Sequence, residues 1–81
     1  MAVAVLRYVQ TLEANETYTG VVTADAVAAA VDANPRMVKT ELERLLEDRY
    51  LDAADHAEDF DGGLDISAPR LTTRGVAALA L

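Results

Sequence analysis

Basic and hydroxyl side chains gather in one short stretch of the sequence, at spacings that a helix places on one side. The stretch contains Arg36, Lys39, Thr40 and Arg44. An Arg guanidinium can donate two hydrogen bonds to the O6 and N7 atoms of guanine, and Lys or Thr can reach a base or a phosphate. The alternative is a solvated helix face, in which Lys39 pairs with Glu43 four residues later.

The single histidine stands in a second, acidic stretch. Carboxylates surround His56 on both sides: Asp52, Asp55, Glu58 and Asp59. Carboxylate and imidazole groups together can bind a divalent metal. A solvated acidic hairpin explains the same residues, and we expect no metal and no cofactor. Ser67 is the only serine and cysteine is absent, so the sequence offers no motif for nucleophilic catalysis and does not predict an enzyme.

Length and composition limit the fold to one small domain over residues 1–81. A hydrophobic share of 52% excludes a disordered tail, and without cysteine the core depends on packing alone. No uncharged stretch approaches the roughly 20 residues of a membrane span. The short apolar start has no basic segment before it, so we do not expect a signal peptide. These features predict a soluble, cytoplasmic protein with no membrane contact.

The charge balance is strongly acidic, with a net charge of −7. Lys39 is the only lysine and Ile66 the only isoleucine, whereas Ala, Val, Asp and Glu are abundant. This composition resembles that of proteins from extreme halophiles. In molar salt the Debye length falls to about 3 Å, so repulsion among carboxylates costs little. The alternative is an ordinary acidic domain.

Periodicity predicts the first two helices. Apolar residues at helical spacing indicate a helix over about Ala2 to Ala14, with its stripe at Val5, Tyr8, Val9 and Leu12. The β-prone segment Thr17 to Val22 fits a short strand or an extended connection. Thr23 is a typical N-cap for a second helix, which buries Ala24, Val27, Ala28 and Val31.

The second half of the chain predicts a helix, a hairpin and a last helix. Asn34 caps a third helix from Pro35 to about Asp48, with a buried face of Val38, Leu42, Leu45 and Leu46. Two strands, Tyr50 to Ala54 and Leu64 to Ser67, are joined through a turn at Asp61-Gly62-Gly63. We expect Pro69 to end strand pairing and Thr72 to cap the last helix. That helix has Val76, Leu79 and Ala80 on one face, and its Gly75 permits close packing.

This order of elements resembles a winged helix-turn-helix domain, of the kind found in small MarR-like and PadR-like archaeal transcription regulators. The segment TADAVAAAVDANPRMVKTELERLLEDRYL, Thr23 to Leu51, is similar to the family's two helices and the entry into the wing. LTTRGVAAL, Leu71 to Leu79, is similar to the start of the helix after the wing. The resemblance implies a mainly α fold with a small β-hairpin, an α+β class.

The sequence departs from the family pattern at two places. The family usually has glycine where the recognition helix ends, and Arg49 stands there. Because a left-handed conformation would strain an arginine, we expect this exit to be built differently. The predicted wing, residues 52–65, carries six acidic residues and neither Lys nor Arg, so it would repel phosphate.

The resemblance implies a sequence-specific DNA-binding transcription regulator whose third helix (about 35–48) lies in the major groove. The base-contacting candidates are Arg36, Lys39, Thr40 and Arg44, and Arg70 and Arg74 are candidates for phosphate contacts beside the wing. Double-stranded DNA is then the partner, and two-fold half-sites favour a homodimer. The apolar end 76–81 is a surface that such a dimer can bury.

The rival interpretation is a winged-helix module that binds a protein through its acidic hairpin and does not bind DNA. Phe60, the only phenylalanine, would then be the anchor, flanked by Asp59 and Asp61. The position of the charges in space discriminates the two. A single basic patch away from the wing favours DNA, whereas neutralisation of that face by Glu41, Glu43 and Glu47 favours the interaction module.

Overall fold

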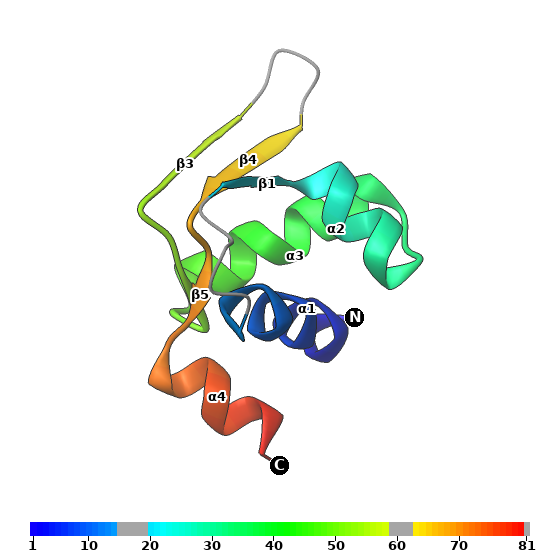
Figure 1. The fold of residues 1–81 in the computed structure, drawn as a ribbon. Coiled ribbons are helices and arrows are strands. Elements are labelled where there is room, and N and C mark those ends of the chain that lie inside the picture. Colours follow the sequence, from blue (N-terminus) through cyan, green and yellow to red (C-terminus); the bar gives the residue numbers. More distant parts are fainter. Residues whose placement is uncertain (15–19, 59–62, 81) are drawn as a thin grey trace.

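The computed structural model describes residues 1–14, 20–58 and 63–80. These residues form a mixed α+β arrangement of four helices and two small antiparallel sheets. Three helices pack together on one side of the larger sheet: α1 (Ala2–Ala14), α2 (Ala24–Val31) and α3 (Pro35–Glu47). The last helix, α4 (Thr73–Leu79), lies against α1 at the end opposite the hairpin (Figure 1). The α+β class predicted from the sequence is confirmed.

The larger sheet has the strand order β1–β4–β3. Its strands are β1 (Val21–Thr23), β3 (Asp55–Glu58) and β4 (Leu64–Ser67). β4 is half-buried as expected, but its hairpin partner is β3 and not the predicted strand Tyr50 to Ala54, because Leu51 and Asp52 pair with Leu71 and Arg70 instead. The turn at Asp61-Gly62-Gly63 includes residues outside the described ranges. The first half of the β-prone segment Thr17 to Val22 also lies outside them, and its end, Val21 and Val22, belongs to the short strand β1.

Strand pairing continues beyond Pro69, so the prediction that it ends there is wrong. β2 (Leu51–Asp52) and β5 (Arg70–Leu71) form a second antiparallel ladder. Between the two ladders Ala68 has a φ of 49° and Pro69 is buried. Because the proline lies in this bend, no ladder hydrogen bond requires its missing N–H, and pairing resumes one residue later.

Three side-chain caps fix where the later helices begin, all as the sequence predicts. Thr23 accepts a hydrogen bond from the amide of Ala26 at 3.0 Å. Asn34 accepts one from the amide of Arg36 at 2.9 Å, and Thr72 accepts one from the amide of Gly75 at 3.1 Å. Each cap satisfies an orphan amide of the first turn, which stabilises a helix by about 1 kcal/mol.

The core lies between the helices and the inner face of the larger sheet. Its buried side chains include the predicted α3 residues Val38, Leu42 and Leu45, and Leu46 is partly buried. The other buried hydrophobic residues are Val5, Leu6, Val9, Val22, Ala24, Val27, Ala28, Leu51, Leu64 and Ile66. Leu42 and its neighbours therefore anchor α3 with one side only, and the opposite side stays accessible.

The last helix turns a different face inward from the predicted one. Val76 is 50% exposed and Ala80 is exposed, whereas Gly75 is buried and Leu79 is half-buried. The reason is the contact of Gly75 with the backbone carbonyl of Tyr50, which a Cβ atom at position 75 would overlap. α4 is thus held through its glycine side, and the close packing expected of Gly75 is confirmed.

Replacement of Gly75 by alanine tests this contact, because two effects predict opposite changes in the free energy of unfolding. Helix propensity favours alanine by up to about 1 kcal/mol, whereas overpacking costs roughly 1–3 kcal/mol. We expect Gly75→Ala to lower the free energy of unfolding in urea titrations at fixed KCl. Ala77→Gly, at an exposed position of the same helix, is the control for propensity alone. A more stable Gly75→Ala variant would contradict the contact.

The exit of α3 is left-handed, with Arg49 at φ 65°, although the sequence predicts a different construction there. The amide of Tyr50 donates to the carbonyl of Leu45 at 2.9 Å, and the amide of Arg49 donates to that of Leu46 at 3.3 Å. This is the Schellman pattern, which normally places glycine at the residue in question. The hydroxyl of Thr72 also donates to the carbonyl of Arg49. Tertiary bonding therefore holds Arg49 in a conformation that its side chain disfavours.

Arg49→Gly should consequently stabilise the domain. Glycine adopts positive φ freely, whereas the left-handed conformation costs a side-chain-bearing residue roughly 1–2 kcal/mol. We expect the free energy of unfolding to rise by about 1 kcal/mol after the greater chain entropy of glycine is subtracted. Asp48→Gly is the matched control, since Asp48 has a φ of −83° and gains nothing from glycine. Equal destabilisation by both substitutions would show that Arg49 is not strained.

Candidate nucleic-acid interface

The accessible side of α3 changes character along its length. Arg36 and Thr40 are exposed in the N-terminal half, and Glu43 and Glu47 are exposed in the C-terminal half. The Thr40 hydroxyl donates to the carbonyl of Arg36 at 3.1 Å, so it keeps its oxygen as an acceptor. Within the described residues, no carboxylate lies within ion-pair distance of Arg36. The start of this side is therefore basic and the end acidic.

Lys39 faces the hairpin instead of the open side of α3. Its Nζ lies 3.6 Å from a carboxylate oxygen of Glu58 and 3.9 Å from one of Glu43. The strand register explains the contact between Lys39 and Glu58. Glu58 stands opposite the buried Leu64, so both side chains lie on the inner face of the sheet. The Lys39–Glu43 pair expected of a solvated helix face is present. Lys39 is thus partly neutralised, with 22% of its side chain exposed.

Arg36 and Arg44 border two different hollows. Arg36 and Thr40 line one of about 390 Å³ together with the two methionines, Met1 and Met37. Met37 is 59% exposed, so the surface beside the predicted base-contacting residues is apolar, which the sequence analysis did not anticipate. Arg44 lines a second hollow, of about 360 Å³, whose wall includes residues of α1 and α4. The two hollows share Glu41, and Arg44 borders the one that lies toward α1 and α4.

Arg70 and Arg74 are both engaged beside the second ladder. Nη2 of Arg70 lies 3.2 Å from a carboxylate oxygen of Asp52, its partner in the strand register. The backbone amide of Ala53 and the guanidinium of Arg70 hold the pKa of Asp52 below its ordinary value of 3.8. The Arg74 guanidinium lies over the ring of Tyr50, 4.7 Å from its centroid. Both cations stay near the surface but already have partners.

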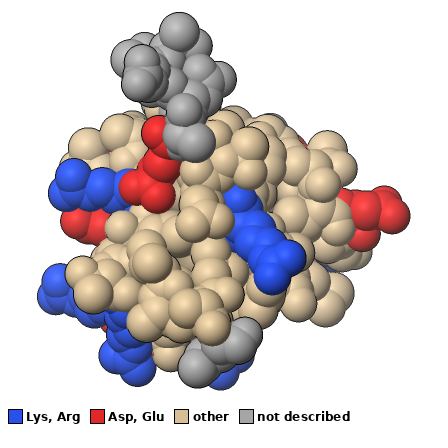
Figure 2. All heavy atoms as spheres, turned by 60° about the horizontal axis from the view of Figure 1, so that its bottom comes forward, with Lys and Arg blue, Asp and Glu red and all other residues tan. Residues whose placement is uncertain are grey.

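The six predicted DNA-contacting residues consequently do not merge into a single patch. Figure 2 shows the Lys and Arg side chains of one face in separate groups divided by uncharged surface. Only Arg36 and Thr40 share one accessible surface at the start of α3. The hairpin residues Asp59, Phe60 and Asp61 lie outside the described ranges. Among residues 1–14, 20–58 and 63–80, no group of three acidic or histidine side chains is arranged to hold a metal.

Comparisons with known proteins give no relative from which a role can be transferred. A scan against family models and searches of curated proteins and solved structures found no match to this chain. In the described part of the chain, no helix combines the length and apolarity needed to cross a bilayer.

The contact between Lys39 and Glu58 should be weak and sensitive to salt. A double-mutant cycle with Lys39→Ala and Glu58→Ala should give a coupling energy below about 1 kcal/mol in about 0.1 M KCl, since the Glu58 side chain is 65% exposed. Screening should abolish this coupling in about 1 M KCl. The matched cycle pairs Lys39→Ala with Glu47→Ala, whose carboxylate has no contact with Lys39. A coupling that persists unchanged in molar salt would show a tighter hairpin contact than the structure has.

Proposed function

We propose that the chain is a winged helix-turn-helix domain and that it binds double-stranded DNA through the N-terminal half of α3. The observation that carries the proposal is the exposure of Arg36 and Thr40 at the capped start of the second helix of an α2–turn–α3 unit. In helix-turn-helix proteins this part of the second helix contacts base edges. The hairpin after α3 and its third strand β1 are consistent with a wing.

The residues at the start of α3 have the chemistry for base contacts. The guanidinium of Arg36 can donate hydrogen bonds to the O6 and N7 atoms of guanine. Thr40 has a hydroxyl oxygen that can accept a hydrogen bond and a methyl group that can contact a base. Lys39 can add a phosphate contact once its ion pair with Glu58 opens. Arg44, Arg70 and Arg74 serve phosphates at the edges of the contact. We therefore expect the half-site to contain a guanine next to an adenine or thymine.

The acidic surface determines how such binding depends on salt. Because binding releases counterions from DNA, the logarithm of the binding constant falls as the logarithm of the salt concentration rises. The slope is roughly −0.9 for each phosphate neutralised. Three of the seven Lys and Arg residues already contact carboxylates or an aromatic ring, namely Lys39, Arg70 and Arg74, which limits the number of phosphates neutralised. Binding then depends on base contacts and shape, and it suits the molar salt that the halophile-like composition implies. We place this function in the cytoplasm, as transcription regulation by a homodimer.

Arg36→Ala is the direct test. Loss of a bidentate guanine contact should weaken binding by roughly 1–3 kcal/mol, or about 5- to 150-fold, at the preferred sequence and much less at other sequences. Fluorescence anisotropy with fragments of genomic DNA, from low to molar KCl, measures the affinity for the preferred sequence and for other sequences. Arg7→Ala is the matched control, because Arg7 is exposed on α1, away from the start of α3. No selective binding at any salt, with Arg36→Ala equal to the parent, would refute the proposal.

The interaction module is the second candidate, supported by a different observation. All four residues of β3 are exposed, and the accessible end of α3 carries Glu43 and Glu47. This acidic surface suits a basic protein partner, with Phe60 as the proposed anchor. Glu43→Gln and Glu58→Gln together should then weaken protein binding and leave DNA binding equal or stronger.

A further inference from the structure

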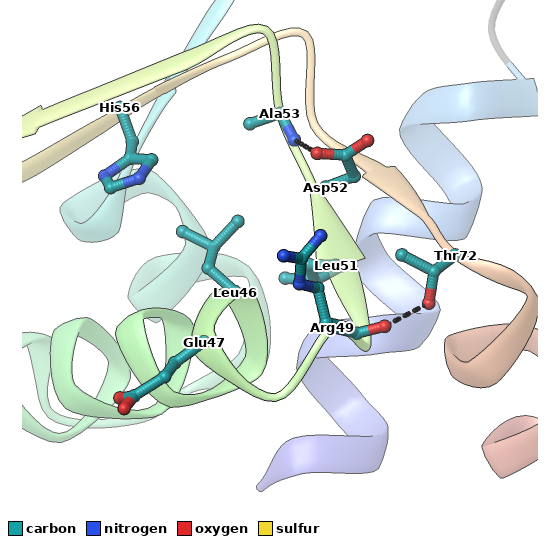
Figure 3. Close-up of a pocket in the computed structure, with 8 residues that line it drawn as sticks. All are labelled: Leu46, Glu47, Arg49, Leu51, Asp52, Ala53, His56 and Thr72. Atoms are coloured by element: carbon teal, nitrogen blue, oxygen red, sulfur yellow. Dashed lines mark hydrogen bonds between the residues drawn. The ribbon is translucent and has the colours of Figure 1, made fainter.

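A hollow of about 350 Å³ lies where the end of α3 meets the bend between β2 and β3. Leu46, Leu51 and Ala53 give it an apolar floor, and the side chains of Arg49 and His56 border it from two different elements (Figure 3). Neither residue belongs to the interface proposed for DNA bases. The sequence suggested only a helix exit for Arg49 and an improbable metal ligand for His56.

Hydrogen bonds on both sides hold the backbone of Arg49, although its side chain is exposed. The Schellman bonds hold it on one side and the Thr72 hydroxyl on the other. This pinned left-handed conformation sends the guanidinium up into the hollow, as Figure 3 shows. A side chain attached to a fixed backbone loses less conformational entropy when it binds a ligand. The strained helix exit therefore also orients the Arg49 guanidinium.

His56 comes to the same hollow through strand register. It stands opposite the buried Ile66, so it shares the inner face of the hairpin instead of the solvent face. β3 extends past the core at this point, which leaves the imidazole exposed above Leu46 (Figure 3). The imidazole therefore approaches the hollow from the hairpin, whereas the guanidinium approaches from the helix exit.

The carboxylates near the hollow do not occupy Arg49. Asp52 already accepts from the Arg70 guanidinium at 3.2 Å and from the amide of Ala53 at 2.9 Å. Glu47 also lines the hollow, but its carboxylate points away from the Arg49 side chain in Figure 3. Within the described residues, no carboxylate lies within ion-pair distance of Arg49. The amide of Ala53, the guanidinium of Arg70 and also Arg49 lower the pKa of Asp52, but Arg49 forms no ion pair with this carboxylate, so its donors stay open to an anion from outside.

We propose that this hollow is a phosphate-binding site in which Arg49 and His56 are the two principal donors. The donors approach from different directions, so the ligand must accept hydrogen bonds on more than one side. A carboxylate uses both oxygens on one guanidinium fork, whereas a phosphate keeps further acceptor oxygens for the imidazole. The apolar floor leaves room for the group that carries the phosphate.

The phosphate can belong to the DNA backbone or to a free phosphorylated molecule, and the chemistry of the site is the same for both. The inference does not depend on the proposed base contacts, because no residue is shared with them. Substitution at Arg49 and substitution at Arg36 therefore separate the two proposals experimentally.

The test uses the single histidine as the reporter, since its ring proton resonances need no assignment among several. Inorganic phosphate is titrated into the protein at constant pH and constant ionic strength, with KCl making up the balance. We expect a saturable shift of the His56 resonances. Arg49→Gly should weaken the apparent affinity by about tenfold or more, the loss typical of a hydrogen bond to a charged group. That variant retains the fold, because glycine suits the left-handed exit.

Arg7→Gln is the matched control, because it removes an exposed cation of α1 that does not line the hollow. It should leave the phosphate titration unchanged. A second titration with duplex DNA identifies the source: a matching His56 shift that Arg49→Gly abolishes supports a backbone phosphate, and no shift supports a free phosphorylated ligand. A linear response to inorganic phosphate, or a saturable one that Arg49→Gly leaves intact, would overturn the site.

Discussion

The backbone carbonyl of Tyr50 is the point on which the arrangement of the second half of the chain depends. It accepts the amide of Thr72 at 3.2 Å, and the bare Cα of Gly75 packs directly against it. The Thr72 hydroxyl bonds to the preceding carbonyl, and Arg74 covers the Tyr50 ring. Residues about 23 positions apart in the chain are thus joined at one turn. This junction fixes the direction in which the hairpin leaves α3 and the side of α4 that faces the core.

The direction of the hairpin in turn determines the electrostatics of α3. Because the hairpin folds back over the helix, it brings Glu58 to Lys39, while Arg36 and Thr40 stay accessible at the start of α3. Exposed ion pairs of this kind contribute little to stability and are screened by salt. They nevertheless decide which cations are available to a ligand. The same geometry places His56 beside the strained exit of the helix.

Features set by local spacing could be predicted from the sequence. Thr23, Asn34 and Thr72 cap helices as expected, and the buried row of α3 follows from its helical period. Features set by contacts between distant residues could not. The left-handed Arg49 requires Thr72, the neutralised Lys39 requires the β3–β4 register, and resumed pairing after Pro69 requires the bend at Ala68. The candidate site was accordingly predicted by residue type but not by arrangement.

The most direct measurement maps amide chemical shifts of ¹⁵N-labelled protein on addition of a selected genomic DNA duplex in high KCl. The account predicts that the largest shifts fall at the start of α3, around Arg36 and Thr40, with smaller ones at the hairpin. The amides at the C-terminal end of α4, beyond Arg74, should stay unchanged, because this end lies away from the hairpin (Figure 1). Shifts confined to the hairpin, or no shifts at saturating DNA, would contradict the claim that this helix binds DNA.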